Sequence, residues 1–314
     1  MAAKTKPPLL GFVGVGVMGS RMARRLVEHG FALIVHDVNP AALKPFVQLG
    51  AKTARSPREV ADRASIVFAS VPTPTVGREV ALGTNGANGI IHGRTVKIYV
   101  DLSTTGSNVA KEVAKALATR GIDTVDSPVS GGASGADKGT LAVMVAGKPR
   151  SVAAVRSALE VIGKVFIVGN TPGQAQMMKL LNNLLSTSAL AMSLEVFVAG
   201  AKAGLDADTM VAVINAGSGR NSATEEKIPK SVLTRNFDFG FPISGACKDI
   251  GLAIEECQAM GLPMIVGSAA RQLWQFAYNQ GGGKRDMTSL ITYLEPWAGV
   301  EVRGKTARNK PKRK

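Results

Sequence analysis

The chain has 314 residues, which predicts about two domains, and 45% hydrophobic with 19% charged residues is typical of a globular protein with a large core. Two cysteines, Cys247 and Cys257, are too few for a disulfide framework. Residues 1–8 are polar and basic, lack the apolar segment of a signal peptide and are predicted to be a disordered N-terminus. A cytoplasmic location is therefore expected.

The net charge of +15 raises the question of a nucleic-acid partner. Seven basic and no acidic residues lie between Arg303 and Lys314, and residues 299–314 are predicted to be a disordered basic tail. The other charges are spread along the chain, so nucleic acid is not the expected partner. The longest apolar stretch, 184–201, is interrupted by serine, threonine and glutamate, and no membrane span is expected.

Short apolar runs alternate with helical patterns through the first half of the chain. A helix is predicted over 17–29. The predicted strands are 9–15, 31–36, 65–71, 95–101, 121–126, 141–146 and 165–168. Strands that are apolar throughout are typical of parallel sheets buried on both faces. Residues 9–170 are therefore predicted to form an α/β, Rossmann-type doubly wound sheet.

The pattern changes at a loop, 169–173, which contains glycine, asparagine and proline. Beyond it the sequence predicts only helices, so residues 171–298 are expected to form an all-α C-terminal domain. The predicted helices are 174–203, 206–215, 248–260, 264–278 and 287–294.

A glycine-rich segment, GVGVMG at 14–19, follows the first predicted strand and opens the first predicted helix. This context is typical of a dinucleotide-binding loop. Gly14 permits the tight turn, Gly16 lets the backbone approach a pyrophosphate, and Gly19 allows close packing of helix on strand. The N–H groups that follow, at Val17 and Met18, begin a helix whose positive dipole end attracts phosphates.

Asp37 ends the second predicted strand. A carboxylate at this place accepts hydrogen bonds from the ribose 2′-hydroxyl of NAD and repels the 2′-phosphate of NADP. No arginine follows it in Val38 or Asn39. The expected cofactor is NAD, with NADP less favoured; the alternative is that Asp37 only caps a turn.

Four motifs together resemble the β-hydroxyacid dehydrogenase family, which includes 3-hydroxyisobutyrate dehydrogenase, tartronate semialdehyde reductase and, more distantly, 6-phosphogluconate dehydrogenase. The resemblance covers about residues 9–298. The motifs are GFVGVGVMG at 11–19, DSPVSGG at 126–132, GQAQMMKLLNN at 173–183 and the pair Lys248-Asp249. Ser127 stands where many members of the family have alanine.

The resemblance implies a Rossmann domain and a helical substrate and dimerisation domain, in a homodimer or homotetramer. No metal is expected, because the three histidines, His29, His36 and His92, lack metal-ligand spacing. Lys179 and Asn183 match the catalytic residues. Cofactor contacts are implied for Val71, Pro72, Val76, Thr104 and Lys248. Substrate contacts are implied for Ser130, Gly131, Gly132 and Asn183.

These residue types suit the oxidation of a hydroxy acid. Lys179 and Asn183 are four residues apart and share one face of a predicted helix, so the amine can take the hydroxyl proton while the amide orients the substrate oxygen. The backbone N–H groups at Gly131 and Gly132 can converge on a carboxylate. From the residues alone, a loop that needs positive φ explains these glycines equally well.

The leading hypothesis is NAD(P)-dependent oxidation of a short 3-hydroxy acid of the 3-hydroxyisobutyrate type to its semialdehyde, with Lys179 as general acid and base. One alternative is the reduction of tartronate semialdehyde. A second alternative is imine reduction, against which Lys179 argues, because imine reductases of this scaffold usually lack that lysine. A non-catalytic NAD-binding regulator whose basic tail touches nucleic acid is the alternative from another class.

Overall fold

The computed structural model describes residues 9–83 and 86–308. Residues 1–8 and 309–314, for which disorder is predicted, lie outside the described residues. Contacts divide the chain into an N-terminal unit, 1–179, and a helical unit, 180–314. The division falls inside a helix, α8 (Gln174–Lys202), rather than in the loop before it. The domain limit near residue 170 stays a prediction.

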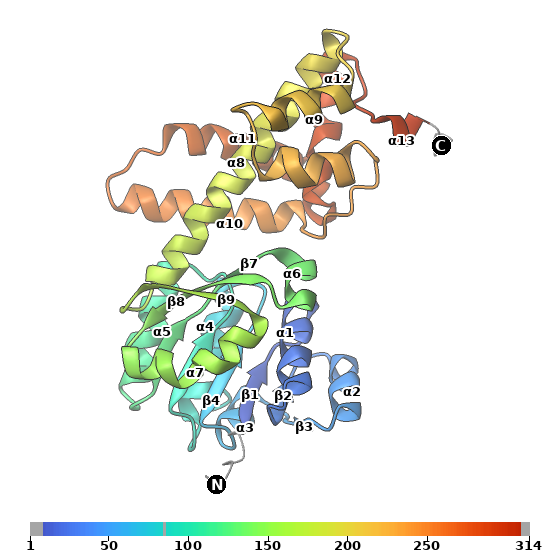
Figure 1. The fold of residues 1–314 in the computed structure, drawn as a ribbon. Coiled ribbons are helices and arrows are strands. Elements are labelled where there is room, and N and C mark those ends of the chain that lie inside the picture. The colour runs from blue at the N-terminus through green and yellow to red at the C-terminus, as the bar shows by residue number, and fades with distance from the viewer. Residues whose placement is uncertain (1–8, 84–85, 309–314) are drawn as a thin grey trace. The chain divides into compact units, whose positions relative to one another are not determined.

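The N-terminal unit is built on one mixed sheet (Figure 1). Its strands are β1 (Leu10–Val13), β2 (Leu33–His36), β3 (Lys52–Thr53), β4 (Ile66–Ala69), β5 (Ile98–Asp101), β6 (Asp123–Asp126), β7 (Val129–Ser130), β8 (Leu141–Gly147) and β9 (Gly163–Gly169). The order β3-β2-β1-β4-β5-β6 is parallel throughout, which is the strand order of a dinucleotide-binding fold. β8 pairs antiparallel with β6 and β7, and β9 lies parallel to β8. The predicted doubly wound sheet is confirmed.

Helices cover both faces of this sheet (Figure 1). The helices are α1 (Val17–Glu28), α2 (Pro40–Gln48), α3 (Pro57–Ala61), α4 (Pro74–Leu82), α5 (Ser107–Ala118), α6 (Gly132–Lys138) and α7 (Pro149–Ile162), with a short 3-10 turn at Ile90–His92. Alternate residues of a strand point to opposite faces. In β1, Phe12 therefore belongs to a hydrophobic cluster that includes residues of α1, α2 and α7, whereas Val13 belongs to one that includes residues of α3, α4 and α5.

The two strands that the sequence did not predict, β3 and β7, each have only two residues. β3 is exposed at the edge of the sheet, so its residues show no apolar run. β7 lies inside the DSPVSGG segment, where proline and glycine indicate a loop. β7 brings Ser130 into the sheet beside Ala142 of β8.

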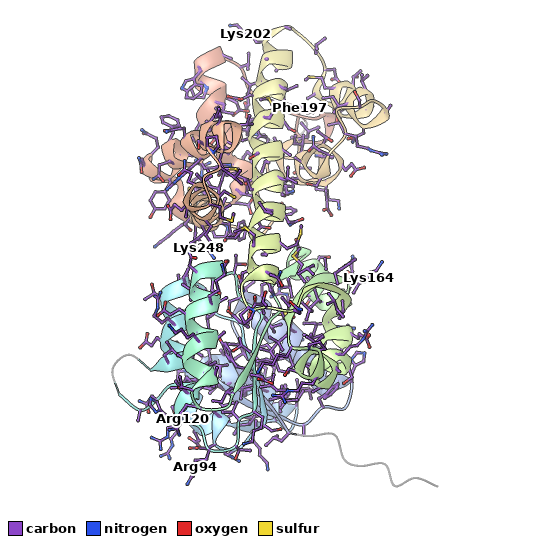
Figure 2. The ribbon with its side chains drawn as sticks, turned by 90° about the vertical axis from the view of Figure 1, so that its left-hand side faces the viewer. Arg94, Arg120, Lys164, Phe197, Lys202 and Lys248 are labelled. Carbon is purple, nitrogen blue, oxygen red and sulfur yellow. The ribbon has the colours of Figure 1, made fainter. Side chains whose placement is uncertain are left out.

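The helical unit consists of helices packed on a shared core that includes α8 residues (Figures 1 and 2). After α8 come α9 (Ala207–Ala216), a π-helix (Ala223–Val232), α10 (Ile243–Ala259), α11 (Ile265–Asn279), 3-10 turns at Gly282–Lys284 and Met287–Leu290, α12 (Ile291–Ala298) and α13 (Lys305–Arg308). The π-helix was not predicted; it contains Pro229, which disrupts the ordinary helical hydrogen-bond pattern. α10 begins before the predicted residue 248, because Ile243 and Ala246 also belong to the core.

α8 is long and apolar enough to cross a membrane by length and composition, with a mean hydropathy of 1.6 over its most apolar window. Half of that window is buried within the protein. Leu190, Leu194 and Phe197 are among its residues in the core of the helical unit, and Phe197 is labelled in Figure 2. These contacts are those of a core helix.

The start of the basic tail is folded, which corrects the prediction of disorder from residue 299 onward. Val302 is buried in the core of the helical unit, and Ala307 of α13 is buried as well. Arg303 forms an ion pair with Glu301 (2.7 Å), and the Lys305 N–H donates to Asp208 (2.8 Å). Disorder was predicted from the charge of the segment alone, and that charge does not reveal the burial of Val302.

Candidate active site

The glycine loop between β1 and α1 has the geometry that a bound pyrophosphate needs. Gly14 has φ +86°, and a Cβ there would overlap the Ser70 carbonyl. A Cβ on Gly19 would overlap the Gly14 carbonyl, so helix and loop touch backbone to backbone. Gly16 has open space around it and caps α1 without a side chain, which leaves the N–H groups of the first turn available to an anion.

Asp37 is held against this loop. Its Oδ2 accepts the Val15 N–H (2.8 Å) and its Oδ1 accepts the Asn39 N–H (2.8 Å). A surface cavity of about 610 Å³ lies beside it, within the size range of small-molecule sites. Asp37 therefore does anchor a turn, and it also faces a space suited to a nucleoside. Arg55 lines the same cavity and forms an ion pair with Glu59 (3.3 Å).

The carboxyl ends of β4 and β5 form the next part of the site. The Val71 N–H donates to Ser103 Oγ (2.9 Å), and the Ser103 N–H donates to Asp101 Oδ1 (2.9 Å). Asp101 Oδ2 accepts the Thr105 hydroxyl (2.9 Å). This network fixes the backbone on both sides of the half-buried Thr104. Pro72 is exposed just before α4, and Val76 is half-buried in its first turn, so all four cofactor contacts predicted here lie at this edge of the sheet.

These features of the N-terminal unit fit a nicotinamide dinucleotide. The fit rests on an uncapped helix start, a glycine that leaves open space above the loop, and an oriented carboxylate beside a cavity. Gly14, Gly16, Gly19 and Asp37 would hold the phosphates and a ribose.

Gln176 ties the first turn of α8 to the same strand ends. Its Oε1 accepts the N–H groups of Thr105 (3.0 Å) and Gly106 (3.2 Å), and its Nε2 donates to the Ser103 carbonyl (2.9 Å). Gln176 is fully buried and stands three positions before Lys179. The helix that carries the candidate catalytic lysine thus begins at a fixed place beside Thr104.

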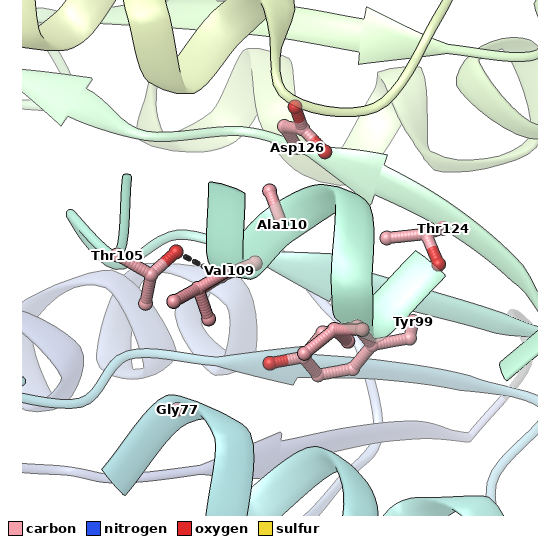
Figure 3. A pocket seen from close by; sticks show the side chains of 9 residues that line it. Gly77, Tyr99, Thr105, Val109, Ala110, Thr124 and Asp126 are labelled. Atoms are coloured by element: carbon pink, nitrogen blue, oxygen red, sulfur yellow. Dashed lines mark hydrogen bonds between the residues drawn. The ribbon is translucent and has the colours of Figure 1, made fainter. Parts of the chain in front are cut away.

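Asp126 is a second anchor for the start of α8. Its Oδ2 accepts the Gly173 N–H, while its Oδ1 has no hydrogen-bond partner. A cavity of about 10 Å³, room for about one water molecule, lies beside it and is also lined by Tyr99, Asp101 and Thr105 (Figure 3). Burial and the negative charge of Asp101 raise the pKa of Asp126 to about 7, although the Gly173 hydrogen bond opposes the shift.

The predicted substrate loop lies between β7 and α6. Ser130 is half-buried, and Gly131 (φ +131°) and Gly132 (φ +64°) are exposed. Both glycines adopt conformations that disfavour other residues, so backbone geometry by itself explains them. Their N–H groups are nevertheless placed at an exposed bend, and the carboxylate cradle stays a prediction.

Lys179 is buried, with 7% of its surface exposed. Composition favours an exposed lysine, so its burial in an apolar helix needs a reason. Asn183 follows one turn later on α8, and its Nδ2 donates to Asp249 Oδ2 (2.6 Å) on α10. Lys248 forms an ion pair with Asp249 Oδ1 (3.0 Å). Asp249 thereby orients the Asn183 amide; a contact of Lys248 with the cofactor stays a prediction.

Sequence reasoning placed Asp126, Gln176 and Asp249 in family motifs but assigned a role in the site to none of them. Each acts on a residue far away in sequence, so local spacing gave no signal. The available signal was chemical: a carboxylate or amide inside an apolar segment must find partners when it is buried.

Comparisons with known proteins identify the family of the chain. The family model for the NAD-binding domain of 6-phosphogluconate dehydrogenase matches residues 9–169, and the model for the NAD-binding domain of NADP-dependent 3-hydroxyisobutyrate dehydrogenase matches residues 173–294. The chain is 34% identical to 2-(hydroxymethyl)glutarate dehydrogenase of Eubacterium barkeri, over 94% of this chain and 97% of that protein. It is also 34% identical to mitochondrial 3-hydroxyisobutyrate dehydrogenase of Mus musculus, over 94% and 88%.

Among solved structures, 3-hydroxyisobutyrate dehydrogenase of Mycobacterium tuberculosis with L-serine is similar at a TM-score of 0.82. It is 29% identical, and the similarity covers 92% of this chain and 99% of that chain. The chain therefore belongs to the β-hydroxyacid dehydrogenase family, and it is an NAD(P)-dependent oxidoreductase that acts on a CH–OH group.

Proposed function

We propose that this enzyme oxidises a short 3-hydroxy acid of the 3-hydroxyisobutyrate type to its semialdehyde. The observation that carries the proposal is a buried lysine, Lys179, one helical turn from Asn183, whose amide is held by a buried carboxylate, Asp249. A buried amine beside an oriented amide suits proton transfer with a hydroxyl group that is held in place.

Each residue has a distinct task in this proposal. Lys179 takes the proton from the substrate hydroxyl in oxidation and returns it in reduction. Asn183 uses the N–H that Asp249 does not occupy to hold the reacting oxygen. Ser130 and the backbone N–H groups after it bind the substrate carboxylate. The bound nicotinamide supplies the acceptor for the hydride that leaves the hydroxyl-bearing carbon.

We propose NAD as the preferred cofactor. Asp37 presents a carboxylate beside the nucleoside-sized cavity, and a negative charge there disfavours a 2′-phosphate. Arg55 on the same cavity favours NADP, and its partner Glu59 offsets that charge. A lower KM for NADP than for NAD would overturn the preference.

A homodimer or homotetramer is proposed as well. α8 exposes apolar side chains at helical spacing, among them Leu185 (75% exposed), Met192 (60%) and Val196 (43%). Such a stripe is favourably covered by a second copy. Light scattering of wild type and of Met192→Glu tests this, since a monomeric wild type would refute it. The expected cytoplasmic location stays a proposal; its support is that Cys247 and Cys257 are both free thiols.

Other acids remain candidates with the same chemistry. Tartronate semialdehyde reduction uses the same lysine. Oxidation of 2-(hydroxymethyl)glutarate is a candidate for a specific reason: this acid has a second carboxylate, and the helical unit holds a buried cation, Lys227, that suits it. Imine reduction and a regulator without activity are less favoured, because the buried Lys179 and the Asn183–Asp249 contact have no task in them.

The test is NADH or NADPH formation at 340 nm with a panel of small hydroxy acids. We expect turnover on 3-hydroxyisobutyrate or a close analogue, preferentially with NAD. Cofactor binding without turnover on any acid in either direction would overturn the proposed activity and favour the imine or regulator alternatives.

A further inference from the structure

The helical unit contains a buried cation that the chemistry above does not use. Lys227 lies in the π-helix with 5% of its surface exposed. Its ammonium donates to Ser186 Oγ (3.2 Å) and Ser222 Oγ (3.2 Å) and lies 5.2 Å from the centre of the Phe239 ring. Among the residues that the structure describes, no carboxylate forms an ion pair with it. Burial lowers the pKa of this lysine.

Nearby acidic side chains are engaged elsewhere. Glu226, which acts on Lys227 through space, forms its ion pair with Lys230 (2.8 Å), and Glu225 pairs with the exposed Arg220 (3.6 Å). An ammonium has three donors, and two serine oxygens accept from two of them. A buried charge with only neutral partners is costly unless an anion joins it.

The segment that covers Lys227 is unusual. A π-helix is rare and frequently marks a functional site. The loop after it holds two residues with positive φ that are not glycine, Arg235 (+58°) and Phe237 (+53°), and such strained backbone also collects at functional sites. Phe239, whose ring packs against the ammonium, is itself 37% exposed, so this ring borders both the cation and solvent.

The position of Ser186 links Lys227 to the catalytic residues. Lys179, Asn183 and Ser186 are spaced i, i+4 and i+7 on α8, so they lie on one face of that helix. Ser186 is about 4.5 Å farther along the helix axis than Asn183. The hydrogen bond to Ser186 therefore holds the ammonium of Lys227 within about one turn of the amide that orients the substrate oxygen.

We propose that Lys227 binds a second carboxylate of the substrate, and that this enzyme prefers hydroxy dicarboxylic acids to hydroxy monocarboxylic acids. The proposal rests on the proposed function and deepens it. The third N–H of Lys227 donates to the distal carboxylate, and Ser222 Oγ supplies a hydroxyl beside it. A carboxylate at this place supplies the anion that the buried ammonium lacks.

The experiment compares the binding of glutarate and butyrate to the full chain with NAD present, by isothermal titration calorimetry. Both probes have a first carboxylate, and only glutarate has a second. We expect wild type to bind glutarate about ten-fold or more tightly than butyrate, as one charge-assisted hydrogen bond provides. Lys227→Met should remove that preference and leave butyrate affinity unchanged, and Lys227→Arg should retain part of it.

Lys230→Met is the matched control, because this exposed lysine lies in the same π-helix and pairs with Glu226; it should change neither affinity. Equal affinity of wild type for both probes would overturn the proposal, even if Lys227→Met does not fold. So would an equal loss of both affinities in a folded Lys227→Met variant. Binding is measured without turnover, so failure of the proposed oxidation is seen separately.

Discussion

In the N-terminal unit, the candidate cofactor contacts are mainly backbone groups in a glycine loop and at strand ends, whereas in the helical unit the candidate contacts are side chains. Gly14, Gly16 and Gly19 matter because they have no side chain: a Cβ on Gly14 or Gly19 would overlap a neighbouring carbonyl, and Gly16 leaves open space. Asn183, Asp249 and Lys227 come from three different helices and act through charge and hydrogen bonds. Cofactor binding should therefore be sensitive to backbone shape, and substrate chemistry to single functional groups.

The sharpest separation of the two roles is expected from Lys179→Ala. Loss of the proton-transferring group should lower kcat by about 10²- to 10⁴-fold, because general acid–base catalysis contributes that much. The Kd for NADH, measured by fluorescence titration, should not change. Lys202→Ala, at the exposed end of the same helix and labelled in Figure 2, is the control and should retain activity. Near-normal turnover of Lys179→Ala would remove the lysine from the mechanism.

In the N-terminal unit most candidate contacts come from the backbone, but Asp126 acts through its side chain. This buried carboxyl accepts the Gly173 N–H and so holds the start of α8. The pKa of Asp126 is about 7 in the folded protein and 3.8 for an ordinary aspartate carboxyl, so the folded state retains the proton to higher pH than the unfolded state. The stability that this carboxyl provides is full below pH 3.8 and is lost as pH rises through 7. Between pH 5 and 8, wild type should lose about 3 kcal/mol of unfolding free energy from this group. Urea titrations should show that loss absent in Asp126→Asn; the same pH slope in both proteins would contradict the assignment.

Substitutions of Asn183 and of its partner Asp249 test whether side chains of the helical unit act on the substrate. Asn183→Ala should reduce kcat about 100-fold, the usual effect of deleting one donor to a reacting oxygen. Asp249→Asn should reduce kcat less, since the amide of Asn183 is then present but less well oriented. Neither change should alter the Kd for NADH. Asn279→Ala, at the exposed last residue of α11, provides the control. A weaker NADH affinity with unchanged kcat would place Asn183 and Asp249 in cofactor binding.

A substitution of Asp123, at the start of β6, should change the free energy of unfolding without changing the candidate site. Burial disfavours its charge, but hydrogen bonds from Lys148, Ser151 and Arg150 outweigh burial and lower the pKa of Asp123 to about 2. The contribution is present above pH 3.8 and is lost as pH falls through about 2. Asp123→Asn should therefore cost about 1–2 kcal/mol of unfolding free energy at pH 7, since solvent screens the exposed partners Lys148 and Arg150, and leave KM values unchanged. An unchanged denaturation midpoint would show that this cluster is worth little.

The smallest effect is expected at the glycine loop, where two substitutions separate folding from binding. A Cβ at Gly16 meets open space, so Gly16→Ala should leave the melting temperature unchanged and raise the Kd for NADH about ten-fold by obstructing the phosphates. Gly19→Ala should lower the melting temperature, because its Cβ overlaps the Gly14 carbonyl. Unchanged NADH affinity in Gly16→Ala would exclude the loop as the phosphate site.

Much of the N-terminal unit was predictable because its function depends on local sequence. A strand, three glycines and a helix follow one another, and Asp37 is one strand away. Lys179 and Asn183 were found through a family motif and their helical spacing. The partner of Asn183 was not found, since the residue that orients it, Asp249, lies on another helix.

The other differences between sequence prediction and structure also come from contacts between residues that are far apart in the sequence. A lysine is usually exposed, so there was no reason in the sequence to expect that Lys227 is buried. Only the fold shows that it is buried in the π-helix beside Phe239. The start of the tail was wrongly predicted because its charge indicates disorder, whereas Val302 is buried in the core and Val300 packs against it. Long-range contacts decide burial, and one sequence contains no direct record of them.

The central claim is that hydride leaves the hydroxyl-bearing carbon of a 3-hydroxy acid when Lys179 takes the hydroxyl proton. The most direct test uses 3-hydroxyisobutyrate deuterated at that carbon, with NAD and wild-type enzyme, followed by NMR of the reduced cofactor. The account predicts deuterium in the NADH that forms, and no label transfer with Lys179→Ala on the same time scale. NADH without deuterium, or equal label transfer by both proteins, would contradict it.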